Sequence, residues 1–113
     1  MTTYATQAES SIGQIEEAAE RVGMAVDAVL DLEERRPLVK SQAIRRLMGT
    51  ENPETQKAHS ASSAEKVVEL DADYAAHREQ QRAAEVEKIR AWAALDAAKL
   101  RAQLHVHLVG AGV

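Results

Sequence analysis

The sequence contains no cysteine and no phenylalanine, and its aromatic residues are Trp92, Tyr4 and Tyr74 alone. Without cysteine the chain has no disulfide framework, no thiolate nucleophile and no cysteine-ligated zinc site. With so few aromatic rings, its apolar core has to be built from Leu, Val, Ile and Ala, and is thin for 113 residues. A thin core favours further burial against a partner or a second copy of the chain.

Long apolar runs and catalytic motifs are also missing. No stretch approaches about 18 apolar residues, and the first ten residues, MTTYATQAES, lack the basic and apolar regions of a signal peptide. We therefore expect a cytoplasmic protein with no membrane contact. The sequence has no nucleotide-binding glycine loop, no metalloprotease motif and no nucleophile elbow. His105 and His107 form a pair that lacks a third metal ligand nearby, so we expect no enzyme, no cofactor, no metal and no small-molecule substrate.

Helical periodicity dominates what remains and predicts an all-α fold, a single domain of three helices. The first helix is expected over about 8–34. Its apolar positions alternate at spacings of three and four, as in a helix–helix seam: Ile12, Ile15, Ala19, Val22, Val26 and Val29, with Ala18, Ala25 and Leu32 widening it. This seam packs either on the same chain or on an external coiled-coil partner. Gly13 and Gly23 either allow close approach of a neighbouring helix or simply weaken this one.

Proline and glycine mark the next boundaries. Pro37 suits the first turn of a new helix, so a second, short helix is expected over about 37–48, ending before Gly49. The polar run at 50–61, TENPETQKAHSA, predicts an exposed loop. Ser62 with Glu65 forms a capping box that opens a long helix over about 62–104. A frayed tail is expected at 105–113.

The long helix is the most informative element, because about forty residues without Pro or Gly would extend on the order of 60 Å if unbroken. That is longer than a compact chain of this size, so the helix projects, lies against another molecule, or kinks near Asp71, where short acidic residues favour a new helix start. It carries one apolar stretch before Tyr74 and another from Val86 to Leu104, with polar residues between them.

A protein-binding surface is expected on this helix. Trp92 either fills the intramolecular core, the interpretation slightly favoured by the sequence, or anchors a partner. The polar residues between the apolar stretches either lie outside the body of the protein or meet a polar partner. The candidate partner-binding residues are Trp92, Ile89, Tyr74, Arg78 and Arg82.

Charge is strongly segregated along the chain. Residues 1–34 contain one base and eight acids, whereas residues 35–66 contain seven bases and three acids. The basic segment either neutralises the acidic first helix or binds phosphate, with free backbone N–H groups at a helix start helping to hold the anion. The candidate nucleic-acid or anion-binding residues are Lys40, Arg45, Arg46, Lys57, His59 and Ser60.

One stretch supports a family resemblance. The run from Asn52 to Ala64, NPETQKAHSASSA, followed by a long Ala- and Glu-rich helix, resembles small helical accessory proteins of bacteriophage and prophage recombination or replication modules. The resemblance covers about residues 48–104, and the pattern has glycine where this chain has Gln56. It implies a phage-encoded accessory factor that acts on a protein or nucleic-acid complex.

Three functions follow from the sequence. The leading hypothesis is a non-enzymatic accessory or adaptor protein that binds a protein partner through helical surface. The first alternative is a nucleic-acid-associated recombination or replication factor that uses the basic segment. The second is a structural homo-oligomer.

Overall fold

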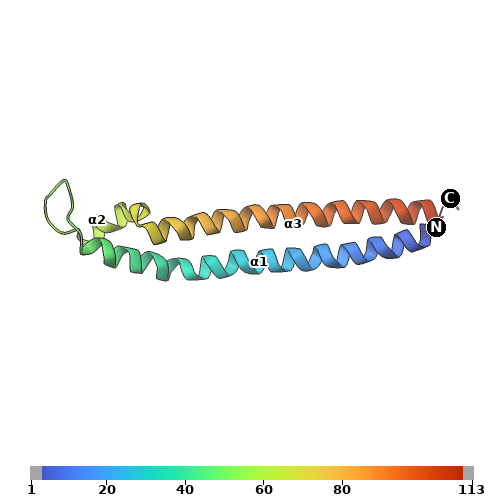
Figure 1. Ribbon diagram of the computed structural model, residues 1–113, viewed down its shortest axis with the longest axis horizontal. Helices are drawn as coiled ribbons and strands as arrows, with labels where there is room; N and C mark the ends of the chain where they lie inside the picture. The colour runs from blue at the N-terminus through green and yellow to red at the C-terminus, as the bar shows by residue number, and fades with distance from the viewer. Residues whose placement is uncertain (1–3, 111–113) are drawn as a thin grey trace. The chain divides into compact units, whose positions relative to one another are not determined.

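The computed structural model describes residues 4–110, and this part of the chain is all-α, which confirms the predicted fold class. The elements are α1 (Tyr4–Met48), α2 (Ala61–Lys66), a 3-10 helix (Val68–Leu70) and α3 (Ala72–Gly110) (Figure 1). The contacts of the chain group into two compact units. Unit 1 consists of α1 up to Ala28 together with α3 from Ala84, and unit 2 consists of residues 29–83.

Unit 1 is an antiparallel pair of helical segments. Ser11 Oγ lies 2.6 Å from His105 Nδ1, and ten residues later in α1 the Arg21 side chain donates to Glu87 at 2.8 Å. In Figure 1 the blue start of α1 accordingly lies beside the red end of α3. The predicted frayed tail is wrong over 105–110, which are helical; residues 111–113 lie outside the described part of the chain.

The seam of unit 1 is made largely of small side chains. Its core contains Val22 and Ala25 of α1 with Ala91 and Leu95 of α3. The α1 seam runs through Ser11, Ile15, Ala18, Val22 and Ala25 and the α3 seam through Ala91, Leu95, Ala98 and Ala102, all at spacings of three and four. The predicted α1 seam is wrong at Ile12 and Ala19, which are exposed, whereas Ala18 and Ala25, predicted to widen the seam, lie in it. Alanines in a seam allow close helix approach, which hydrophobicity alone does not reveal.

Unit 2 contains the second part of α1, the loop, α2, the 3-10 helix and the first turns of α3. Its core is formed by Ala43, Val68 and Tyr74, and Val39, Ile44 and Leu47 pack against it. The predicted helix break at Pro37 is wrong, because α1 continues through Pro37 to Met48. Val39 and Ala43 anchor the helix beyond the proline, and this tertiary packing outweighs the lost hydrogen bond.

The predicted long helix over 62–104 is divided near Asp71, as the kink alternative anticipated. Helix α2 begins after Ser60, whose side chain accepts a hydrogen bond from the Ser63 backbone N–H, so the predicted cap at Ser62 lies two residues too late. Residues 49–60 are non-helical, close to the predicted loop. Asp71 Oδ2 accepts from the Tyr74 N–H at 2.9 Å, the hydrogen bond of an N-cap at the start of α3.

Candidate functional site

The five partner-binding candidates are divided between the two units. Tyr74, Arg78 and Arg82 belong to unit 2, and Ile89 and Trp92 belong to unit 1. Tyr74 is only 2% exposed and packs in the unit 2 core, so its side chain offers no surface to a partner.

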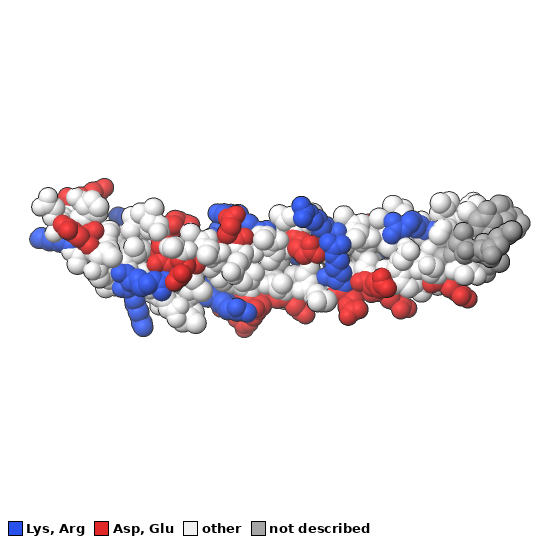
Figure 2. Space-filling view, viewed as in Figure 1, with Lys and Arg blue, Asp and Glu red and all other residues white. Residues whose placement is uncertain are grey.

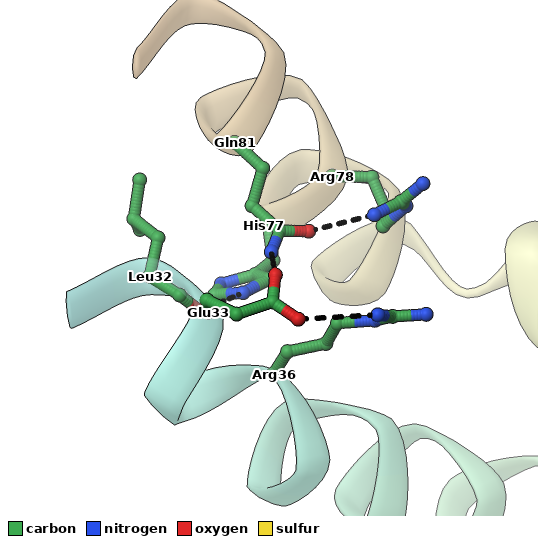
Figure 3. Close-up of polar contacts among 6 residues, drawn as sticks. All are labelled: Leu32, Glu33, Arg36, His77, Arg78 and Gln81. Atoms are coloured by element: carbon green, nitrogen blue, oxygen red, sulfur yellow. Dashed lines mark hydrogen bonds and ion pairs between the residues drawn. The ribbon is translucent and has the colours of Figure 1, made fainter. Parts of the chain in front are cut away.

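The polar residues of α3 in unit 2 meet polar residues of α1. Figure 3 shows a chain of contacts in which Arg78 donates to Gln81 at 2.9 Å and Gln81 donates to Glu33 at 3.0 Å. Glu33 also pairs with Arg36 at 3.4 Å. The polar partner expected for this part of the helix is therefore another part of the same chain.

His77 and Arg82, two further side chains of unit 2, also bind groups of the same chain. His77 is buried, and its Nε2 donates to the Leu32 carbonyl oxygen at 2.9 Å (Figure 3). Arg82 forms an ion pair with Glu79 one turn earlier. Arg78 and Arg82 are thus both engaged within the chain, although Arg82 remains exposed.

Trp92 and Ile89 are exposed, by 46% and 65% respectively. This decides against the core alternative for Trp92. Both belong to a set of large exposed apolar side chains of α3. Because successive residues turn by about 100°, Val86, Ile89, Leu100 and Leu104 lie opposite the buried seam, and Trp92 and Val106 lie on its flank. We call this set the outer face of α3: Val86, Ile89, Trp92, Leu100, Leu104 and Val106.

An open groove of about 510 Å³ adjoins the outer face within unit 1. It is lined by Ile15 of α1 and by α3 residues near its C-terminal end: Lys99, Ala102, Gln103, Val106 and His107. Asp96 and Lys99 are exposed on the same side of α3, and within the described residues neither side chain has a hydrogen bond or ion pair. Asp96, Lys99 and Gln103 lie in the predicted long helix but at polar positions, which the apolar pattern does not single out, and His107 lies in the predicted frayed tail.

The basic candidates divide between paired and unpaired side chains. Arg46 holds Asp71 through two hydrogen bonds of 3.0 and 2.8 Å, and Lys40 lies 3.4 Å from Glu65. The hydrogen bonds from Arg46 hold the pKa of Asp71 down at about 2. Within the described residues, the side chains of Arg45 and Lys57 have no such partner.

The remaining anion-binding candidates build the local structure before α2. Ser60 is the N-cap, and His59 Nδ1 lies 3.0 Å from Ser63 Oγ. The loop before them is closed by an isolated bridge between Glu51 and Ala58 and by a hydrogen bond from the Asn52 N–H to the Lys57 carbonyl. Gln56 has a φ of 57°, a left-handed conformation that favours glycine.

Among residues 4–110, no three His, Cys, Asp or Glu side chains gather as they would around a metal ion. In the same part of the chain, no helix is both long and apolar enough to cross a membrane. Comparison with protein-family models, with curated proteins and with solved structures finds no match.

Proposed function

We propose that this chain is a non-enzymatic helical accessory protein that binds another protein through the outer face of α3. The observation that carries the proposal is the distribution of apolar side chains in unit 1. The α3 seam buries mainly alanines, whereas larger side chains such as Ile89 and Leu100 face outward, at 65% and 66% exposure. A helix normally buries its largest apolar side chains and leaves polar ones outside.

The size of the patch supports the same proposal. Burying one large aliphatic side chain contributes about 1.5–3 kcal/mol at about 25 cal/mol per Å², so each exposes on the order of 100 Å². The six residues of the outer face together then expose roughly 600 Å², which is at the upper end for the largest apolar patch of a monomeric protein. Burial of this surface by a partner would also supplement the thin core.

The loop pattern at 52–64, through its resemblance to phage and prophage accessory proteins, supports a role in the assembly of a recombination or replication complex in the cytoplasm. Direct nucleic-acid binding by the basic segment has less support. Lys40 and Arg46 are already paired with carboxylates of α2 and of the segment that starts α3. Among the six candidates, Arg45 and Lys57 are then the bases whose side chains have no partner within residues 4–110.

The proposal is tested by capture from a lysate of the native host with three tagged baits: the wild-type chain, Ile89→Glu and Met24→Glu. Met24 is the matched control, since it is a large apolar residue of unit 1 that is 68% exposed on α1. We expect the wild type and Met24→Glu to retain the same proteins and Ile89→Glu to lose them, with unchanged helical circular dichroism in all three. Identical capture by Ile89→Glu would overturn the proposal, and loss of capture after nuclease treatment would favour the nucleic-acid alternative.

A further inference from the structure

The outer face of α3 carries both a protruding side chain and a groove that match each other. Trp92 and Gln103, which lines the groove, are eleven residues apart, which is three helical turns plus about 20°, so they lie on the same side of α3. The separation along the helix is about 16 Å. A protruding ring and a groove on one helix side are arranged so that two copies can each fill the groove of the other.

Resting on the proposed function, we propose that the partner at the outer face is a second copy of this chain. The two α3 segments pack antiparallel about a two-fold axis that passes midway between Trp92 and Gln103. Trp92 of each copy then sits in the groove of the other, next to Gln103 and Val106. Such a contact is isologous, because the same surface is used by both copies and the assembly closes at the dimer.

Charge supports this arrangement independently of shape. The midpoint between Trp92 and Gln103 falls between Asp96 and Lys99, so the two-fold axis brings Asp96 of each copy opposite Lys99 of the other. Both side chains are exposed and without a partner within the described residues. The dimer therefore supplies two reciprocal ion pairs, and an antiparallel register shifted by one turn would lose them.

Area sets the strength of the dimer. Ile89, Trp92 and Val106 face the axis and contribute on the order of 300 Å² from each copy. Val86 and Leu104 lie about 110° away from the axis, so the contact is smaller than the roughly 1,200 Å² lower bound of a standard protein–protein interface. Ile89 lies opposite Val106 at each end of the contact, so apolar side chains flank the charged centre. An interface of this size predicts a reversible dimer rather than a permanent one.

The closing experiment exchanges the charges at the axis. Asp96→Lys and Lys99→Asp each place like charges opposite each other in a homodimer, whereas a mixture of the two variants restores two attractive pairs. Sedimentation equilibrium of the wild type should give a concentration-dependent mass approaching twice 12.3 kDa. We expect each variant alone to dimerise at least about tenfold more weakly and the equimolar mixture to recover wild-type affinity.

Trp92, the single tryptophan, gives a second readout. Its fluorescence should shift to shorter wavelength as the dimer forms, and circular dichroism should be unchanged, because both exchanged residues are exposed. A wild-type mass that stays monomeric at 100 µM, a mass that rises beyond the dimer, or a mixture no tighter than the single variants would overturn the inference. Loss of capture by Ile89→Glu together with a monomeric wild type would leave the proposed function standing with a different partner. Failure of both tests would remove both proposals.

Discussion

Gln56 is held in a backbone conformation that costs free energy. Gln56 has a φ of 57°, and its N–H donates a hydrogen bond to the Asn52 carbonyl oxygen at 2.8 Å, which closes the loop. A side chain with a Cβ is disfavoured in this region by about 1 kcal/mol, whereas glycine adopts it freely. The resembled pattern has glycine at this position, and the turn nevertheless forms here with glutamine.

We expect Gln56→Gly to raise the free energy of unfolding by about 0.5–1 kcal/mol in urea denaturation. The gain is partial because glycine also has more conformational freedom to lose when the chain folds. Gln56→Ala is the control, since it removes the side chain beyond Cβ and keeps the strain, and it should give no gain. If the free energy of unfolding of Gln56→Gly is no higher than that of Gln56→Ala, the turn imposes no strain on residue 56.

Asp71 joins two elements of unit 2. It caps the start of α3 through the Tyr74 N–H and is held by Arg46 of α1. Because the pKa of Asp71 is lowered from 3.8 to about 2, the folded state binds the proton less readily than the unfolded state. The stabilisation is therefore complete above pH 4 and is lost as the pH falls from about 4 to about 2.

We expect Asp71→Asn to lower the urea midpoint at pH 7, and this difference from the wild type to close as the pH approaches 2. The amide retains an oxygen for the cap but not the charge that Arg46 requires. Asp73→Asn serves as the control, because Asp73 is 78% exposed and lies farther from Arg46, at 3.5 Å. A wild-type advantage over Asp71→Asn that persists unchanged at pH 2 would contradict the ion-pair explanation.

Among the elements, α1 contains the clearest conflict between local preference and tertiary structure. Pro37 lies inside the helix and has no N–H to donate to the carbonyl of Glu33, four residues earlier. The helix persists because Val39 and Ala43 beyond the proline pack against Val68 and Tyr74. The boundary predicted at this point was reasonable from the residue type, and the packing that overrides it is not visible in the sequence.

Pro37→Ala should raise the free energy of unfolding by about 1–3 kcal/mol, since it restores one helical hydrogen bond and removes a steric clash. Pro37 is exposed, so the change removes no core contact. Ser41→Ala, at another exposed position of α1, should change stability by only a few tenths of a kcal/mol. Equal effects of the two substitutions would mean that the helix accommodates the proline without cost.

Helix α3 shows what periodicity can and cannot predict. The sequence identified the apolar positions from Val86 to Leu104 as one stretch, and the structure confirms that they share a helix. It did not show that Ala91 and Ala98 form the buried seam while Ile89 and Leu100 face outward. An alanine-rich helix offers more than one apolar side, and only the second helix decides which is covered.

For the molecule as a whole, the fold class and the polar loop followed from periodicity and turn residues. The candidate residues behave differently in the structure: Trp92 and Ile89 are exposed, whereas Tyr74 is buried, and residue type alone did not separate Tyr74 from the other two. Charge segregation was also informative. Figure 2 shows acidic side chains along the α1 edge of unit 1. In the basic segment, Arg35 and Arg36 pair with Asp31 and Glu33 of the acidic stretch. Lys40 and Arg46 pair instead with Glu65 and Asp71.

The alanines in the seam of unit 1 do not by themselves fix the register between its two helical segments. Ala84, Ala91 and Ala98 recur every seven residues, so sliding α3 by one heptad in one direction would replace Ala91 and Ala98 by alanine, but would bring Lys88 to the position of Leu95. Packing at these two alanine positions therefore does not distinguish the two registers, whereas packing at Leu95 does. The contacts of Ser11 with His105 and of Arg21 with Glu87 also distinguish them, because a slipped pair would separate both partners. In unit 1, the packing of small residues therefore holds the two helical segments together, and the contacts of Ser11 with His105 and of Arg21 with Glu87 fix their register.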